Sequence, residues 1–137
     1  MRAKHPDPRD VGMVQRVLAL VAALFGVVTV FAGTRVLTGA DPGYLVWLPL
    51  LLYNTVMGLG YVAAGFLAWR SIERGQLAAA AIFTLNLLVL AAVAYLYTAG
   101  QAVALDSVRA MLLRTVVWLL LFLGLAWLGR KRRRGLA

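Results

Sequence analysis

The sequence predicts an all-α integral membrane protein in which four transmembrane helices form an up-down-up-down bundle with both termini in the cytoplasm. Three observations predict it: an apolar composition, four long apolar runs with short connections, and a one-sided distribution of cationic residues. Of the 137 residues, 63% are hydrophobic and 14% are charged. A soluble domain has about 45–50% apolar and about 25% charged residues, so lipid must cover most of this apolar surface.

Each of the four apolar runs is long enough to cross a bilayer as a helix. They cover residues 13–33, 44–69, 76–99 and 108–129. A helix needs about 20 residues to cross about 30 Å of hydrocarbon, and the runs lack the strict alternation of barrel strands. Residues 1–12 then form a cytoplasmic N-terminal tail, and residues 130–137 form a basic cytoplasmic C-terminal tail.

The connections between the runs are too short to hold a soluble domain. They comprise residues 34–43, 70–75 and 100–107. Asp41-Pro42-Gly43 is a turn signal before the second helix, and Gly75 and Gly100 are expected at helix ends.

Lys and Arg residues predict the orientation of the bundle. One side would carry Arg2, Lys4, Arg9, Arg16, Arg70, Arg74, Arg130, Lys131, Arg132, Arg133 and Arg134, and the other Arg35, Arg109 and Arg114. The positive-inside rule places the richer side, with both termini, in the cytoplasm. So strong a bias opposes insertion in both orientations, so any homo-oligomer is expected to be parallel. The compact size and the composition rich in Ala, Leu and Arg favour a bacterial inner membrane.

Every predicted helix carries one stripe of small and polar residues, the kind of surface through which helices associate in lipid. The four stripes are Gln15, Ala22, Gly26, Thr29 and Gly33; Asn54, Gly58, Tyr61 and Gly65; Ala79, Phe83, Asn86, Leu90, Val93 and Tyr97; and Met111, Arg114, Thr115, Trp118, Phe122 and Gly129. Four such stripes predict a bundle. A face not used in the bundle, such as the one bearing Tyr61 and Gly65, could receive a partner.

Asn54 and Asn86 are the most informative polar pair, because a carboxamide in hydrocarbon needs hydrogen-bond partners. They meet if the second and third helices are neighbours. One interpretation is that they bond to each other or to nearby Thr and Tyr side chains and hold the bundle together. The other is that they line a cavity for a ligand or ion. Pro49 predicts a kink near Tyr53 and Asn54.

Arg114 is the only charge set well inside an apolar run, about six residues from the outer end of the predicted fourth helix. It could be an anchor that reaches towards water with Asp106 as counter-ion, or a binding group for an anionic head group. In the second case an acyl chain would run down past Trp118. The residues proposed for a polar core or ligand site are Asn54, Tyr61, Asn86, Tyr97, Arg114, Thr115 and Trp118.

The C-terminal tail begins with five successive cations, a feature typical of attraction to anionic phospholipid and of fixed topology. They are Arg130, Lys131, Arg132, Arg133 and Arg134. An acidic partner or nucleic acid is the alternative for such a run, but its place beyond an apolar helix favours lipid, and no nucleic acid is expected as partner.

The four runs contain no Asp, Glu, His or Cys, so the sequence predicts no catalytic centre, no metal site and no cofactor. A pigment or quinone against Trp118 and Phe122 is the weaker alternative to a core role for these rings.

In size and helix number the chain is similar to the small multidrug transporters and the small fluoride channels. The first group's acidic residue in helix one has no counterpart here, and the charge bias conflicts with the second group's dual insertion.

Two functions follow from these observations. The first is a non-catalytic accessory or scaffold subunit of a larger membrane complex, or of a parallel homo-oligomer, acting through helix–helix contacts. The second is a small transporter, channel or carrier of lipid or another small molecule, with a cavity near Asn54, Asn86 and Arg114. A core closed by side chains favours the first, and a cavity that touches these three residues favours the second.

Overall fold

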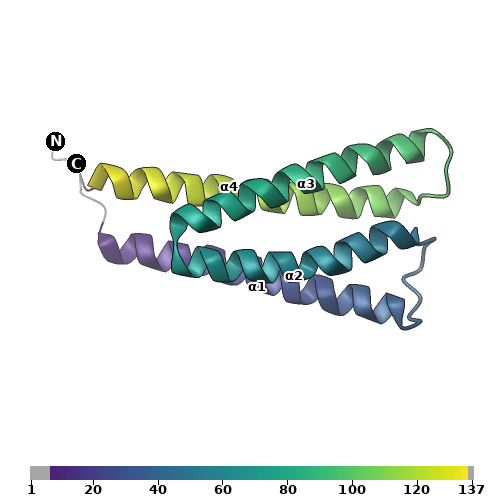
Figure 1. Cartoon of the computed structure of the whole chain (residues 1–137), viewed down its shortest axis with the longest axis horizontal. Coiled ribbons are helices and arrows are strands. Elements are labelled where there is room, and N and C mark those ends of the chain that lie inside the picture. The colour runs from purple at the N-terminus through teal and green to yellow at the C-terminus, as the bar shows by residue number, and fades with distance from the viewer. Residues whose placement is uncertain (1–6, 136–137) are drawn as a thin grey trace.

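The structure, a computed structural model, describes residues 7–135, which form four helices (Figure 1). They are α1 (Pro8–Leu37), α2 (Leu48–Arg70), α3 (Ile72–Thr98) and α4 (Leu105–Gly135). All four are long and apolar enough to cross a membrane, which confirms the prediction of four apolar helices. Even α2, the shortest with 23 residues, has a length of about 35 Å at 1.5 Å per residue.

The helices are arranged as two hairpins. The contacts of α1 are mainly with α2 and those of α3 mainly with α4, while contacts between α2 and α3 and between α1 and α4 join the hairpins. Figure 1 shows consecutive helices running in opposite directions along the long axis. The start of α1 therefore lies at the same end of the molecule as the end of α4.

The first and last helices, α1 and α4, extend beyond the apolar runs. At the N-terminus, Asp7 accepts a hydrogen bond from the Arg9 amide (2.9 Å) and caps α1, so residues 8–12 of the predicted tail are helical. Similarly, α4 continues to Gly135 through most of the basic tail. The length of an apolar run reflects the thickness of the hydrocarbon layer, not the length of the helix. A helix continues beyond the apolar run where its backbone hydrogen bonds are made and its residues have a high helix propensity. Residues 1–6 and 136–137, including Arg2 and Lys4, lie outside the described residues.

The predicted loop over residues 70–75 is a single residue, Ser71, which ends α2 and begins α3. Its hydroxyl accepts a hydrogen bond from the Arg74 amide at 3.3 Å, so it caps α3. Gly75 does not end a helix, contrary to the prediction. It is buried in the first turn of α3, where a Cβ would lie 2.5 Å from the Cα of Ala68, so its small size allows α3 to leave α2 at close range.

The connection between α1 and α2 contains the predicted turn. Asp41 accepts a hydrogen bond from the Gly43 amide (2.8 Å), and Gly43 has a positive φ of 84°. Pro49 gives no reason to expect the kink predicted near Tyr53 and Asn54, because it lies in the first turn of α2. An amide there has no partner within the helix, so proline removes no helical hydrogen bond.

The buried face of α1 follows the predicted stripe and includes Ala22, Gly26, Thr29 and Gly33. A Cβ on Gly26 would lie 2.7 Å from the Gly58 carbonyl oxygen, and one on Gly33 would overlap the Thr55 hydroxyl. The two backbones thus approach as closely as glycine allows.

The core between the hairpins is centred on two aromatic side chains, Tyr61 and Trp118, which are 0% and 1% exposed. Their ring centroids lie 4.9 Å apart. Gly65 also faces inwards, because a Cβ there would meet the Ala23 amide nitrogen at 2.7 Å. The face bearing Tyr61 and Gly65, suggested above as a partner surface, is therefore already used inside the bundle.

Candidate functional site

The fully buried polar residue of α3, Asn86, is bonded inside the bundle rather than to Asn54. Its Oδ1 accepts hydrogen bonds from the Tyr53 hydroxyl (2.9 Å) and the Tyr61 hydroxyl (3.2 Å), and its Nδ2 donates to the Tyr61 oxygen (3.0 Å). We call Tyr53, Tyr61 and Asn86 the polar triad. Because these bonds join α2 to α3 and occupy the carboxamide, the triad has the features of a structural group.

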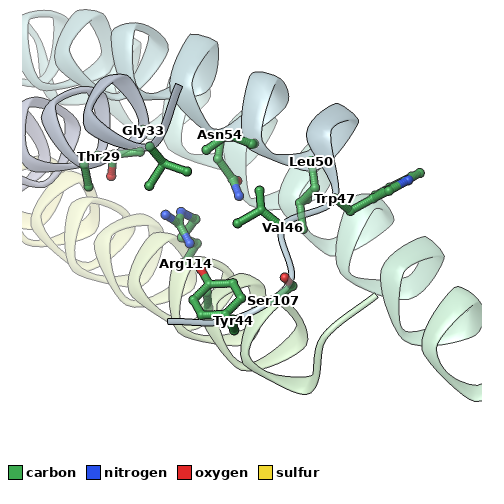
Figure 2. Close-up of a pocket in the computed structure, with 13 residues that line it drawn as sticks. Thr29, Gly33, Tyr44, Val46, Trp47, Leu50, Asn54, Ser107 and Arg114 are labelled. Atoms are coloured by element: carbon green, nitrogen blue, oxygen red, sulfur yellow. The ribbon is translucent and has the colours of Figure 1, made fainter. Parts of the chain in front are cut away.

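Asn54 lies one residue after Tyr53 and has a different environment. Its Oδ1 is buried and has no hydrogen-bond partner. The side chain lines a cavity of about 110 Å³ between α1, the α1–α2 connection, α2 and α4 (Figure 2). We call it the outer cavity, because it lies at the end of the molecule away from the start of α1. Its lining comprises Thr29, Ala32, Gly33, Val36, Tyr44, Val46, Trp47, Leu50, Leu51, Asn54, Ser107, Ala110 and Arg114.

Arg114 enters the outer cavity from α4, opposite Asn54 on α2 (Figure 2). Its side chain is half-buried, and its Nε is buried without a hydrogen-bond partner. The predicted counter-ion Asp106 contacts Arg109 instead, with 3.7 Å between Oδ1 and Nη1. The physical reason is spacing: α4 begins at Leu105, so Arg109 lies one turn from Asp106 and Arg114 lies more than two turns away.

Three further polar side chains line the outer cavity: Thr29, Tyr44 and Ser107. The Thr29 hydroxyl donates to the Phe25 carbonyl (2.7 Å), which leaves its oxygen free to accept. Tyr44 comes from the α1–α2 connection and is 38% exposed, and its ring lies beside Arg114 in Figure 2. The sequence analysis placed Thr29 only in a packing stripe and Tyr44 in no site, because the path of the connection cannot be derived from composition.

The remaining predicted site residues are dispersed. Tyr97 is exposed on the surface of α3. The Thr115 hydroxyl donates to the Met111 carbonyl of its own helix (2.8 Å), and Trp118 is packed in the core with an Nε1 that has no hydrogen-bond partner. Trp118 is thus not the wall of an acyl-chain cleft below Arg114. Of the seven predicted residues, the structure brings Asn54 and Arg114 to one cavity and Tyr61 and Asn86 to the polar triad.

The outer cavity offers a fixed positive charge beside a carboxamide. A guanidinium stays protonated in proteins, and its planar set of N–H donors matches the oxygens of a carboxylate or phosphate. Asn54 has an acceptor oxygen that is buried and unused, so it can bind a hydroxyl, an ammonium or water. Within residues 7–135, no three His, Cys, Asp or Glu side chains come close enough to hold a metal ion.

The four apolar helices define a multi-pass membrane protein. Comparisons with protein-family models, with curated proteins and with solved structures find no match to this chain. The interpretation of the site therefore depends on its own geometry.

Proposed function

We propose that this chain is a non-catalytic protein of a bacterial cytoplasmic membrane that binds a small anionic group, a carboxylate or a phosphate, in the outer cavity. The observation that carries the proposal is the half-buried Arg114, whose Nε has no partner although the cavity beside it has room for several water molecules. An arginine at this depth is costly to insert, and such residues generally mark a binding site or pathway.

The proposed topology places the outer cavity on the external side and both termini in the cytoplasm. The cationic majority described above supports it through the positive-inside rule. Cations lie over aromatic rings near both ends of the helices: Arg16 over Trp69 (5.5 Å) at one end and Arg35 over Phe31 (5.9 Å) at the other. Such pairs are favoured where an aromatic belt meets head groups.

Binding is better supported than conduction through the bundle. Tyr61, Trp118, Leu121 and Leu125 are each at most 4% exposed and fill the space between the helices beyond the outer cavity. Asn86, which a pathway through the protein would use, is occupied by two tyrosine hydroxyls. We therefore propose a carrier or binding protein that takes its ligand from one side.

An accessory subunit is the second candidate, and the same closed core favours it. The two proposals are compatible, because a subunit can hold a lipid or solute against its partner. Purification in mild detergent separates them: a stoichiometric larger complex supports the subunit, and a free monomer or parallel dimer supports an independent carrier.

The test is ligand binding to the purified protein with and without the guanidinium. Inorganic phosphate, acetate and short-chain phosphatidylglycerol are titrated by calorimetry into the wild type, Arg114→Leu and Arg109→Leu. Arg109 is the matched control, since it lies on the same helix but is exposed and paired with Asp106.

Hydrogen bonds to a charged group contribute about 1.5–3 kcal/mol, so we expect Arg114→Leu to weaken binding of at least one probe about 10- to 100-fold and Arg109→Leu to leave it unchanged. Equal affinities of the wild type and Arg114→Leu for all three probes would contradict the proposal.

A further inference from the structure

The end of the molecule opposite the outer cavity has two adjoining hollows. The first, of about 430 Å³, lies between the start of α1, the α2–α3 junction and the end of α4. The second, of about 570 Å³, is an open groove along α1. The first is lined by Pro8, Val11, Gly12, Gln15, Arg70, Ile72, Lys131, Arg132 and Gly135, and the second by Pro8, Arg9, Gly12, Met13, Arg16, Val17 and Leu20. Pro8 and Gly12 line both hollows, so the two hollows lie on either side of the low ridge that α1 forms at these residues.

Both hollows are basic. Arg70, Lys131 and Arg132 line the first, and Arg9 and Arg16 line the second. The acidic groups of the described chain nearby are Asp7, Asp10 and Glu73, and none of them lines either hollow. Asp7 caps α1, and Glu73 contacts Arg132 at 3.8 Å between two exposed side chains. Each hollow therefore keeps an excess of positive charge.

One cation lining the second hollow and two lining the first lie over aromatic rings near the ends of the helices, a pairing that is favoured where aromatic side chains meet lipid head groups. Arg16 lies over Trp69 (5.5 Å), Arg70 over Phe66 (5.0 Å) and Lys131 over Trp127 (4.8 Å). Trp69, Phe66 and Trp127 are exposed on the lipid-facing surface of the helices.

The groove along α1 continues away from its two arginines over apolar side chains. Val17 and Leu20 form this part, whereas Met13 lies between the two arginines, and each of the three is at least half exposed. The groove thus has a charged head and an apolar extension in the order in which a phospholipid presents its phosphate and its acyl chain.

We propose that these two hollows form one binding site for a phospholipid whose head group carries two phosphates, with one phosphate in each hollow and the linking group over Gly12. Gly12 is suited to this position because a Cβ there would meet no atom of the described residues within 4 Å, so no side chain of residues 7–135 occupies the ridge. The first hollow is a basic recess between transmembrane helices, a form of site that binds lipid head groups, and the second lies along the surface of α1 beside it.

This site differs from diffuse attraction by the C-terminal cations. Of the five successive cations, Lys131 and Arg132 line the first hollow, whereas Arg130, Arg133 and Arg134 line neither of the two hollows. The site is also separate from the anion site proposed above, which lies at the opposite end of the helices. Lipid binding by diffuse attraction falls with the total positive charge removed, whereas lipid binding at a built site falls only when the cations of that site are removed.

The experiment uses the full chain in mild detergent and native mass spectrometry, with diphosphatidylglycerol and phosphatidylglycerol of the same acyl chains as probes. The variants are Arg16→Gln with Arg70→Gln, one cation from each hollow, and Arg130→Gln with Arg134→Gln, which removes the same charge outside them. The measured quantity is the ratio of the two lipid affinities at equal phosphate concentration.

We expect the wild type to prefer diphosphatidylglycerol by about tenfold or more, since each cation near a phosphate contributes a factor of about five. The Arg16/Arg70 variant should lose this preference and the Arg130/Arg134 variant should keep it. Gly12→Leu, which fills the ridge, should reduce the preference while binding of phosphatidylglycerol stays unchanged. The proposal is overturned if the wild type shows no preference, or if the two double variants lower the ratio equally. Circular dichroism of each variant establishes that its helices are intact.

Discussion

The asparagines on two neighbouring helices, Asn54 of α2 and Asn86 of α3, have opposite hydrogen-bonding states. At the residue scale, this contrast distinguishes a residue that stabilises the bundle from a residue that is available to a ligand. Asn86 bonds to Tyr53 and Tyr61, while Asn54 keeps a buried oxygen without a partner beside Arg114. A buried polar group without a partner is costly unless a ligand or water satisfies it. Asn54 is therefore the residue whose state should change when the cavity is filled, and Asn86 the residue whose removal should affect stability.

Replacing Asn86 by alanine should destabilise the bundle. The variant Asn86→Ala leaves two tyrosine hydroxyls without their shared partner, and hydrogen bonds between membrane helices contribute about 0.6 to 2 kcal/mol each. We expect a loss of about 1–2 kcal/mol in unfolding by sodium dodecyl sulfate from mixed micelles. Thr84→Ala is the control, because Thr84 is exposed and bonds only to its own helix, at Ala80. Equal stabilities of the two variants would show that the triad contributes nothing.

At the scale of elements, α1 and α2 are held together mainly by close packing at glycines, and Gln15 of α1 adds hydrogen bonds to the Ala68 (2.8 Å) and Trp69 (3.3 Å) carbonyls of α2. Gly26, Gly58 and Gly65 all lie where a Cβ would come within about 3 Å of backbone atoms of the facing helix. Without a hydrophobic driving force between helices in lipid, this close approach supplies the van der Waals contact that joins them. The hairpin is therefore sensitive to single methyl groups.

Gly26→Ala should separate α1 from α2. The added methyl would lie 2.7 Å from the Gly58 carbonyl oxygen and from the Val62 amide nitrogen, and overpacking of this kind costs about 1–3 kcal/mol. Gly60→Ala is the matched control, because its Cβ would meet only the Met57 methyl at 3.9 Å. It should leave stability unchanged or raise it by up to about 1 kcal/mol through helix propensity. The same unfolding assay compares them, and a Gly26→Ala variant as stable as Gly60→Ala would contradict the packing described.

Pro49→Ala should have little effect. A proline in the middle of a helix costs about 3 kcal/mol relative to alanine, but Pro49 occupies the first turn of α2, where its missing amide has no helical partner. We expect a change within about 1 kcal/mol in the unfolding assay. A gain of about 3 kcal/mol in the free energy of unfolding would contradict this, because it would indicate that Pro49 disrupts the interior of a helix.

The helices and their small-residue stripes could be predicted because they depend on local length, hydropathy and spacing. The buried set Ala22, Gly26, Thr29 and Gly33 of α1 follows directly from 3.6 residues per turn. The partner of Asn86 could not be predicted, because it depends on the rotation of α2 about its axis. Tyr53 and Tyr61, eight residues apart on one face of α2, were the available signal for the triad.

The outer cavity could be predicted only in part. The alternative function predicted a cavity near Asn54, Asn86 and Arg114, and the lining of the outer cavity includes Asn54 and Arg114 but not Asn86. Tyr44 could not be assigned to them, since it reaches the cavity through the fold of the α1–α2 connection. The misassignment of Asp106 arose because the start of α4 lies one turn earlier than the apolar run.

At the scale of the whole molecule, the two proposed sites lie at opposite ends of the bundle: the outer cavity at one end, and the two basic hollows at the end that holds the start of α1 and the end of α4. The outer end holds a partly enclosed cavity with one guanidinium, and the other end has open basic hollows on the surface. A core with nearly inaccessible Tyr61 and Trp118 lies between them.

Cysteine labelling tests the proposed orientation. The chain contains no Cys, so single substitutions provide unique labels. Gln101→Cys lies in the α3–α4 connection and Gly135→Cys at the end of α4, and both positions are exposed. A membrane-impermeant maleimide added to intact cells should label Gln101→Cys only, and labelling of Gly135→Cys should require lysis. The reverse pattern would invert the topology and place the outer cavity in the cytoplasm.

The unequal packing of the helices has a consequence for synthesis. Because α1 contacts α2 far more than it contacts α4, most of the packing partners of α1 are already present when a ribosome has delivered the first two spans. The first hairpin can then close in the bilayer while the second is still being translated, since domains generally fold from the N-terminus as they emerge. In this first hairpin the hydroxyls of Tyr53 and Tyr61 lack their partner until α3 is made, and the cavity beside Asn54 stays open until α4 is made.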